Sequence, residues 1–255
     1  MRKKQDKPHI LITGAASGIG AACARKLASQ NNRLYLHTGN NHQALEGLAE
    51  DLQKQHATEI HCFTADFTQQ AEVKHFIDQL KSEAGYIDQL VLNAGYADKG
   101  GFESLTTSTL NKALAVMTQT PAQLIQAFFE DIKQSPYGRI ISISSFVNKS
   151  SGLNDSFFTM TAAAKGGLEG LTLDAARQFK KGPATANIIS PGYTRKDGKK
   201  SAFTDHQWAE LASRLPLQRL VEPEEVAALV QFLLSDAAAM ITGQNLVIDS
   251  GLSLK

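Results

Sequence analysis

Short runs of apolar, often β-branched residues alternate along this sequence with longer segments in which apolar residues recur at helical spacing. Strands are expected at residues 9–13, 33–38, 59–65, 87–92, 139–144, 185–190 and 245–249. Helices are expected at residues 18–30, 43–56, 69–84, 107–134, 159–180 and 224–234. Because parallel strands need long crossover connections, this order predicts an α/β chain. We expect a doubly wound parallel sheet of about seven strands between two helical layers, a three-layer sandwich.

Length and composition fit one folded unit. The chain has 255 residues, of which 42% are hydrophobic and 20% charged, and no linker, repeat or low-complexity tract divides it. We therefore expect a single domain over 1–255. The formal net charge of +1 gives no reason to expect nucleic acid or a membrane surface as a partner.

The sequence also carries predictions about cellular location. The first residues are polar, and the apolar stretch after them is too short for a signal peptide. No apolar run approaches the ~20 residues that a membrane helix needs. Cys23 and Cys62 provide no disulfide framework and are interpreted as buried thiols, and no metal site is expected. Together these features predict a cytoplasmic protein.

A glycine-rich turn joins the first expected strand to the first expected helix. Gly14, Gly18 and Gly20 permit a tight turn and close backbone approach. The N–H groups and the positive end of the following helix can then face a pyrophosphate. A turn of this kind between strand and helix predicts dinucleotide binding, although glycine-rich turns alone also occur in ordinary loops.

The spacing of this turn resembles that of the short-chain dehydrogenase/reductase family, and the resemblance extends over nearly the whole chain. The motifs that carry it are TGAASGIG at 13–20, ADFT at 65–68, NAG at 93–95, PG at 191–192, EPEEVA at 222–227, ITGQ at 241–244 and DSG at 249–251. The resemblance implies a Rossmann-like fold, an NAD or NADP cofactor, and a small-molecule carbonyl or alcohol substrate. It also implies a homodimer or homotetramer.

The resemblance assigns a set of residues to the cofactor. They are Gly14, Ser17, Gly18, Ile19, Gly20, Thr38, Asp66, Phe67, Asn93, Ala94, Gly95, Lys165, Pro191, Gly192 and Thr194. Asp66 alternatively serves only as a helix cap, and Asn93 alternatively serves only to hold the central strands together. Thr38 stands where NAD-preferring relatives place an acid, which favours NADP, with His37 or His42 as candidate partners of the 2′-phosphate.

Ordinary members of the family use an Asn, a Ser, a Tyr and a Lys for catalysis, with the Tyr as general acid. Ser145 and Lys165 match this pattern. Thr161 stands four residues before Lys165, where the Tyr is usual, and Met117 stands where the Asn is usual. An aliphatic hydroxyl is a far weaker acid than a phenol, so Thr161 is a poor replacement. The resemblance therefore implies a divergent member of the family.

Three functions remain open at this point. The first is an NAD(P)-dependent oxidoreductase of a carbonyl/alcohol pair with an atypical proton donor: Lys165, a water, or a tyrosine. Tyr96 and Tyr193 border the expected substrate pocket, although either can be there only for packing. The second is a weakly active or inactive protein that binds a dinucleotide in a regulatory or partner role. The third is a lyase or isomerase with a bound nucleotide.

Two further predictions come from the C-terminal half. Residues 195–215 are expected to form a substrate lid, in which the basic residues of 194–200 attract an anionic substrate or are only solvated. Phe203 and Trp208 are expected to face the substrate or to pack the lid down. Glycines at 166, 167 and 170 interrupt an otherwise regular helix, which predicts close packing against a second copy of the chain.

Overall fold

The computed structural model describes residues 7–28, 32–56, 58–150, 156–195 and 203–254. Its described strands form one parallel sheet of seven strands in the order β3-β2-β1-β4-β5-β6-β7. Their bounds are β1 His9–Ile12, β2 Arg33–Thr38, β3 Glu59–Thr64, β4 Gln89–Leu92, β5 Arg139–Ile143, β6 Thr185–Pro191 and β7 Asn245–Ile248. The doubly wound sheet predicted from the sequence is confirmed. The strand order reverses between β1 and β4, which is where such sheets bind ligands.

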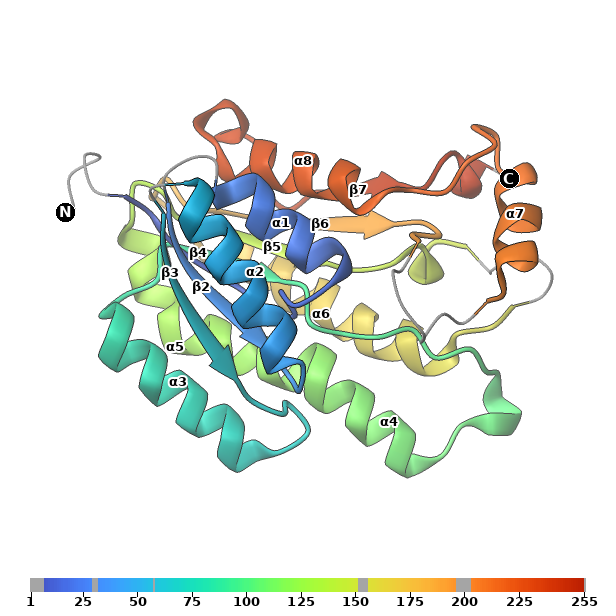
Figure 1. Ribbon diagram of the computed structural model, residues 1–255, viewed down its shortest axis with the longest axis horizontal. Coiled ribbons are helices and arrows are strands. Elements are labelled where there is room, and N and C mark those ends of the chain that lie inside the picture. The colour runs from blue at the N-terminus through green and yellow to red at the C-terminus, as the bar shows by residue number, and fades with distance from the viewer. Residues whose placement is uncertain (1–6, 29–31, 57, 151–155, 196–202, 255) are drawn as a thin grey trace.

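Helices cover both faces of the sheet (Figure 1). One layer contains α1 (Gly18–Ala28), α2 (His42–Gln55) and α8 (Pro223–Leu234). The other contains α3 (Gln70–Ala84), α4 (Thr107–Leu114), α5 (Thr120–Gln134) and α6 (Thr159–Gln178). A short helix, α7 (Asp205–Ser213), lies beyond the carboxyl ends of β6 and β7.

Each face of the sheet has its own apolar core, because alternate strand residues point to opposite sides. In β1, Ile10 and Ile12 pack with α1, α2 and α8, whereas Leu11 packs with the α3, α5 and α6 side. Two such cores under two helical layers explain the near-continuous apolar character of the central strands. The free thiol of Cys23 is buried in the first core as predicted, and burial raises its pKa to about 12; Cys62 is only half-buried.

The long helix expected at 107–134 is interrupted. Residues Ala115–Gln119 form a π-helical turn between α4 and α5, in which the N–H of Thr120 donates to the carbonyl of Ala115, five residues earlier. Pro121 has no N–H for the carbonyl of Met117, so regular helical pairing fails at this point. None of the described helices is long and apolar enough to cross a membrane.

Candidate active site

A cleft of about 940 Å³ opens at the carboxyl edge of the sheet, where the strand order reverses. It brings together most of the residues that the sequence assigned to cofactor and chemistry. Those that line it are Gly14, Ser17, Gly18, Ile19, Thr38, Asn93, Ala94, Gly95, Tyr96, Ser145, Thr161, Lys165, Pro191, Gly192, Tyr193 and Thr194. No Asp or Glu is among the described residues that line the cleft, while Lys165 and Arg195 are. The cleft is therefore suited to an anionic ligand.

The glycine-rich turn has the shape that a phosphate ligand requires. Gly14 and Gly18 have φ values of +69° and +52°, a region that side chains disfavour. A Cβ atom on Gly20 would lie 2.1 Å from the Gly14 carbonyl oxygen, so the turn closes tightly on the first residues of α1. A Cβ on Gly18 would meet nothing within 4 Å, which leaves open space beside the helix N-terminus. The first turn of α1 holds no acidic residue, so a pyrophosphate fits this end of the helix.

Thr13 and Asn93 hold this turn against β4. The Asn93 side-chain amide donates to the carbonyl oxygens of Thr13 and Gly14 at 2.9 and 3.1 Å. The Thr13 hydroxyl oxygen in turn lies 3.0 Å from the backbone N–H groups of Asn93 and Ala94. Asn93 therefore does the structural work considered for it in the sequence and also lines the cleft.

A histidine that the sequence suggested as a phosphate partner supports the same turn from inside. His37 is buried, its Nε2 lies 2.9 Å from the Ala65 carbonyl oxygen, and the Gly14 N–H donates to its Nδ1 at 3.4 Å. Burial lowers the pKa of His37 to about 4, so its ring is neutral at physiological pH. His42 is exposed and lies 3.0 Å from Glu46.

Three residues assigned to the cofactor lie outside the cavity lining: Gly20, at the start of α1, Asp66 and Phe67. Phe67 is buried, and its ring is stacked on that of His37 with 3.9 Å between centroids and 4° between planes. The Asp66 carboxylate is exposed and accepts hydrogen bonds from the Thr68 N–H and hydroxyl, both at 2.8 Å. Thr38 does line the cleft, and its hydroxyl accepts from the Asn41 N–H at 3.4 Å.

Ser145, Thr161 and Lys165 all line the cleft. Lys165 is buried, and its ammonium donates to the Ile143 carbonyl oxygen at 2.6 Å. The Thr161 hydroxyl accepts the N–H of Asp98 at 3.1 Å, which ties α6 to the loop after β4. Ser145 begins a 3₁₀ turn after β5 and exposes its side chain to the cavity.

Glu169, which the sequence did not single out, supports the turn that presents Ser145. It lies one helical turn beyond Lys165 on α6. Its carboxylate accepts from the Ser144 hydroxyl at 2.5 Å and from the Asn148 amide at 3.0 Å. Both partners are close to Ser145 in the chain, so Glu169 connects this turn to the helix that carries Lys165.

The two candidate tyrosines have different surroundings. Tyr96 is exposed at the cleft mouth, and partial burial together with the negative charge of Asp98 raises the pKa of its phenol. That is opposite to the shift that an acidic catalytic tyrosine needs. Tyr193 is buried among aromatic rings and contacts Phe146 with 4.7 Å between centroids.

A family model described as enoyl-(acyl carrier protein) reductase matches residues 14–253. The chain is 28% identical over 242 residues to the 3-oxoacyl-[acyl-carrier-protein] reductase of Escherichia coli, covering 95% of this chain and 96% of the relative. It is 27% identical over 245 residues to the acetoacetyl-CoA reductase of Allochromatium vinosum, covering 95% and 97%. A short-chain dehydrogenase from Burkholderia cenocepacia, solved in complex with NADP, superimposes with a TM-score of 0.86 at 27% identity, covering 99% of this chain and 100% of that one.

The chain belongs to the short-chain dehydrogenase/reductase family. The family resemblance inferred from the motifs is thereby confirmed. Met117, at the position where family members usually place an Asn, is fully buried inside the π-helical turn. A Cβ on Gly95 would lie 2.9 Å from the Met117 sulfur and 3.2 Å from the Lys165 ammonium nitrogen, so these side chains flank the same stretch of the cleft wall.

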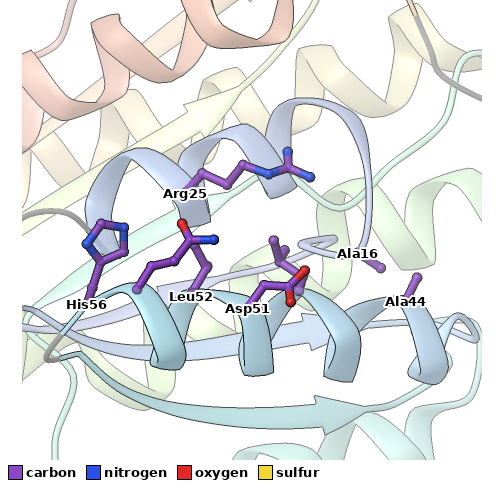
Figure 2. A pocket seen from close by; sticks show the side chains of 8 residues that line it. Ala16, Arg25, Ala44, Asp51, Leu52 and His56 are labelled. Carbon is purple, nitrogen blue, oxygen red and sulfur yellow. The ribbon is translucent and has the colours of Figure 1, made fainter.

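A second, smaller cavity of about 390 Å³ lies between α1 and α2. Figure 2 shows Arg25 projecting from α1 over the cavity, with Asp51 and Leu52 of α2 below it. None of the residues predicted for cofactor or chemistry lines it; it shares only Ala16 with the large cleft. Across the part of the chain that the structure describes, no group of three or more His, Cys, Asp or Glu is placed to hold a metal ion.

Proposed function

We propose that this chain is an NADP(H)-dependent oxidoreductase of a carbonyl/alcohol pair whose proton donor is not a tyrosine. The observation that carries the proposal is the convergence of Ser145, Thr161 and Lys165 beside a phosphate-binding turn in one cleft. The names of the relatives, which are reductases of β-keto thioesters, support the same reaction class.

The dinucleotide would be held by the residues already described. The pyrophosphate would lie on the first turn of α1, at Ser17, Gly18 and Ile19, and the adenine-side ribose would lie near Thr38. The neighbouring Asn40 and Asn41 are neutral hydrogen-bonding side chains, and none of the described residues that line the cleft is an Asp or Glu that would repel a 2′-phosphate. The NADP complex of the structural neighbour agrees with this preference.

When bound, the reduced nicotinamide supplies a hydride to the carbonyl carbon. Ser145 would donate a hydrogen bond to the carbonyl oxygen and so orient it. Lys165, held by the Ile143 carbonyl, would bind the nicotinamide ribose and keep an ammonium proton next to that oxygen. Thr161 would have a structural role and not a catalytic one, since its hydroxyl accepts the Asp98 N–H and so holds the loop after β4. We assign the proton to Lys165 because its side chain is buried in the cleft wall, whereas Tyr96 is exposed at the cleft mouth and the aliphatic hydroxyl of Thr161 is a weak acid.

The whole chain, 1–255, would act as one domain with a substrate lid near 195–215. Of that segment, residues 196–202 lie outside the described residues, as do most of the basic residues of 194–200. The chain would assemble as a homodimer or homotetramer through α6. Gly167 is explained within the chain, because a Cβ there would lie 2.6 Å from Thr118. A Cβ on Gly170 would meet nothing within 4 Å, so this exposed position is available to a partner.

The test is a fluorescence titration with NADPH and NADH, followed by a carbonyl screen that monitors cofactor oxidation. We expect NADPH to bind more tightly than NADH, and turnover to survive Tyr96→Phe and Tyr193→Phe but not Lys165→Ala. Tight NADPH binding without turnover across the screen would instead favour the alternative of an inactive dinucleotide-binding protein. Failure to bind either nucleotide would overturn both.

A further inference from the structure

One end of the cleft is walled by aromatic rings from separate parts of the chain. They are Tyr96 after β4, Phe146 after β5, Phe158 at the start of α6, Tyr193 after β6, and Phe203 and Trp208 at α7. We call these six residues the aromatic wall. None of them comes from the ends of β1 and β2, which supply the glycine-rich turn and Thr38.

The rings of the aromatic wall support one another mostly edge to face. Tyr193 lies at their centre, with Phe203 and Trp208 at 5.9 and 6.3 Å between centroids and interplanar angles of 78° and 77°. Phe203 and Trp208 are themselves 4.9 Å apart at 66°. Such tilted packing fixes the rings in place and turns their edges and faces in different directions, so a further ring can be added to the set.

Most of the aliphatic side chains that pack with the wall do not line the cleft. The same cluster includes Leu211, Leu215, Leu220 and Leu252 as buried members, and none of these lines the cleft. Val147 is the one aliphatic side chain from this cluster that does. A pocket for a plain alkyl chain has no need of this arrangement, whereas a planar aromatic ligand gains from ring-to-ring contact.

The charges around the wall limit the ligand further. The Lys99 ammonium lies 5.3 Å from the centre of the Phe203 ring, and Arg195 lines the cleft next to Tyr193 and Thr194. No described acidic residue lines the cleft, but two carboxylates lie near the wall: the charge of Asp98 acts on Tyr96, and Asp205 lies 3.9 Å from Arg195. With charges of both signs around it, the wall is suited to a neutral ring system.

We propose that the substrate of this chain is a neutral aromatic ketone, bound with its ring system against the aromatic wall and its carbonyl group at Ser145. This inference rests on the proposed function, of which it specifies the substrate class. It is independent of the identity of the proton donor.

Trp208 allows the contact to be measured directly, because it is the only tryptophan of the sequence. The experiment titrates 2-tetralone and 2-decalone, bicyclic ketones of equal carbon number that differ in having an aromatic ring, and follows Trp208 emission. We expect 2-tetralone to quench this emission and to bind about 3- to 10-fold more tightly than 2-decalone. Equal or tighter binding of 2-decalone, or no binding of 2-tetralone while NADPH binds, would overturn the proposal.

Variants separate the wall from general apolar attraction. Phe203→Leu keeps Trp208 as the fluorescent probe. It should weaken the binding of 2-tetralone about 3- to 10-fold and leave the Kd of 2-decalone within about 2-fold of the wild-type value. Phe102→Leu changes a phenylalanine that is 82% exposed and does not line the cleft, and it should leave both ligands unchanged. Tyr96→Leu is the second wall variant. Tyr96 is exposed, so this substitution leaves the buried core unchanged and any weaker ketone binding reports on the wall. Equal weakening of both ketones by Phe203→Leu and Tyr96→Leu would refute the aromatic preference.

A parallel titration with NADPH separates this proposal from the proposed function. If the protein binds NADPH and reduces 2-decalone without preferring 2-tetralone, the proposed reductase function is supported and only the aromatic substrate class is refuted. If the wild-type protein binds neither nucleotide while 2-tetralone still quenches the Trp208 emission, the proposed reductase function is refuted and the aromatic ligand class is supported.

Discussion

The hydroxyl oxygen of Thr161 accepts the backbone N–H of Asp98 at 3.1 Å. This bond joins α6 to the loop after β4, and both Thr161 and Ser145 line the cleft. Where ordinary family members are expected to hold a catalytic phenol, this chain therefore holds a short side chain that connects two walls of its own cleft.

Restoring the phenol should accelerate the reaction. Thr161→Tyr places an acidic hydroxyl four residues before Lys165, whose positive charge lowers the pKa of a neighbouring phenol. We expect kcat for carbonyl reduction to rise about 10²- to 10⁴-fold, the range that a positioned general acid contributes. Thr161→Phe is the control, because it has nearly the same volume without the acid. Equal rates for the two variants would show that a phenol at this position does not supply the proton.

Lys165 should contribute to cofactor affinity as well as to rate. Replacing it with Met keeps the length of the side chain and removes its charge and its bond to the Ile143 carbonyl. We expect the Kd for NADPH to rise about 10- to 100-fold, as for loss of a hydrogen bond to a charged group. Lys112→Met, on the exposed surface of α4, serves as the matched control in a fluorescence titration. An unchanged Kd for Lys165→Met would argue against its place at the ribose.

His37 should make the stability of the fold depend on pH in the acid range. Burial lowers the pKa of His37 from 6.5 to about 4. Between these two pH values His37 is therefore protonated in the unfolded chain and neutral in the folded chain. The contribution of neutral His37 to the free energy of unfolding is fully present above pH 6.5. It is lost as the pH falls toward 4, by up to about 1.4 kcal/mol per pH unit.

The measurement is urea unfolding of the wild type and His37→Gln at pH 7 and pH 5. The variant should be less stable at pH 7, because it loses the stack on Phe67, but its unfolding free energy should change less between the two pH values. The remaining histidines are common to both proteins and cancel in the comparison. Identical pH dependence would mean that folding does not lower the pKa of His37.

Assembly should be sensitive to the exposed glycine of α6. Gly170→Arg adds a long charged side chain where the chain itself leaves open space, so it should convert the homo-oligomer to monomers, as measured by light scattering. Gly47→Arg is the matched control: it is also exposed and helical with open space around its Cβ, but it lies on α2 in the opposite layer. If both variants keep the wild-type mass, or if the wild type is itself monomeric, the interface does not involve this position.

The sequence was most informative where one periodicity or one backbone requirement decides the structure. The sheet, its helical layers and the glycine-rich turn follow from local pattern, and Lys165 and Ser145 lie together because their segments end at the same sheet edge. The π-helical turn was missed because residues 107–134 keep a helical apolar pattern throughout, and only Pro121 hints at the break.

Contacts between distant segments account for the rest. The stack of Phe67 on His37 joins a residue expected in the cofactor site to one suggested as a partner of the 2′-phosphate, and both rings are buried. The bonds from Glu169 to Ser144 and Asn148 link segments about one element apart in the chain, which no local pattern encodes. Phe203 and Trp208 were expected either to face the substrate or to pack the lid, and both line the cleft and pack against a cluster of buried apolar residues.

The bonds that Thr13 and Asn93 make to the glycine-rich turn have a consequence for timing. Because these bonds form within the protein itself, the turn has its final shape before any nucleotide arrives. Little backbone freedom is then lost at the moment of encounter, so association should be limited by diffusion and orientation and not by a slow ordering step. Stopped-flow mixing with NADPH should accordingly show a single phase whose rate constant rises linearly with nucleotide concentration.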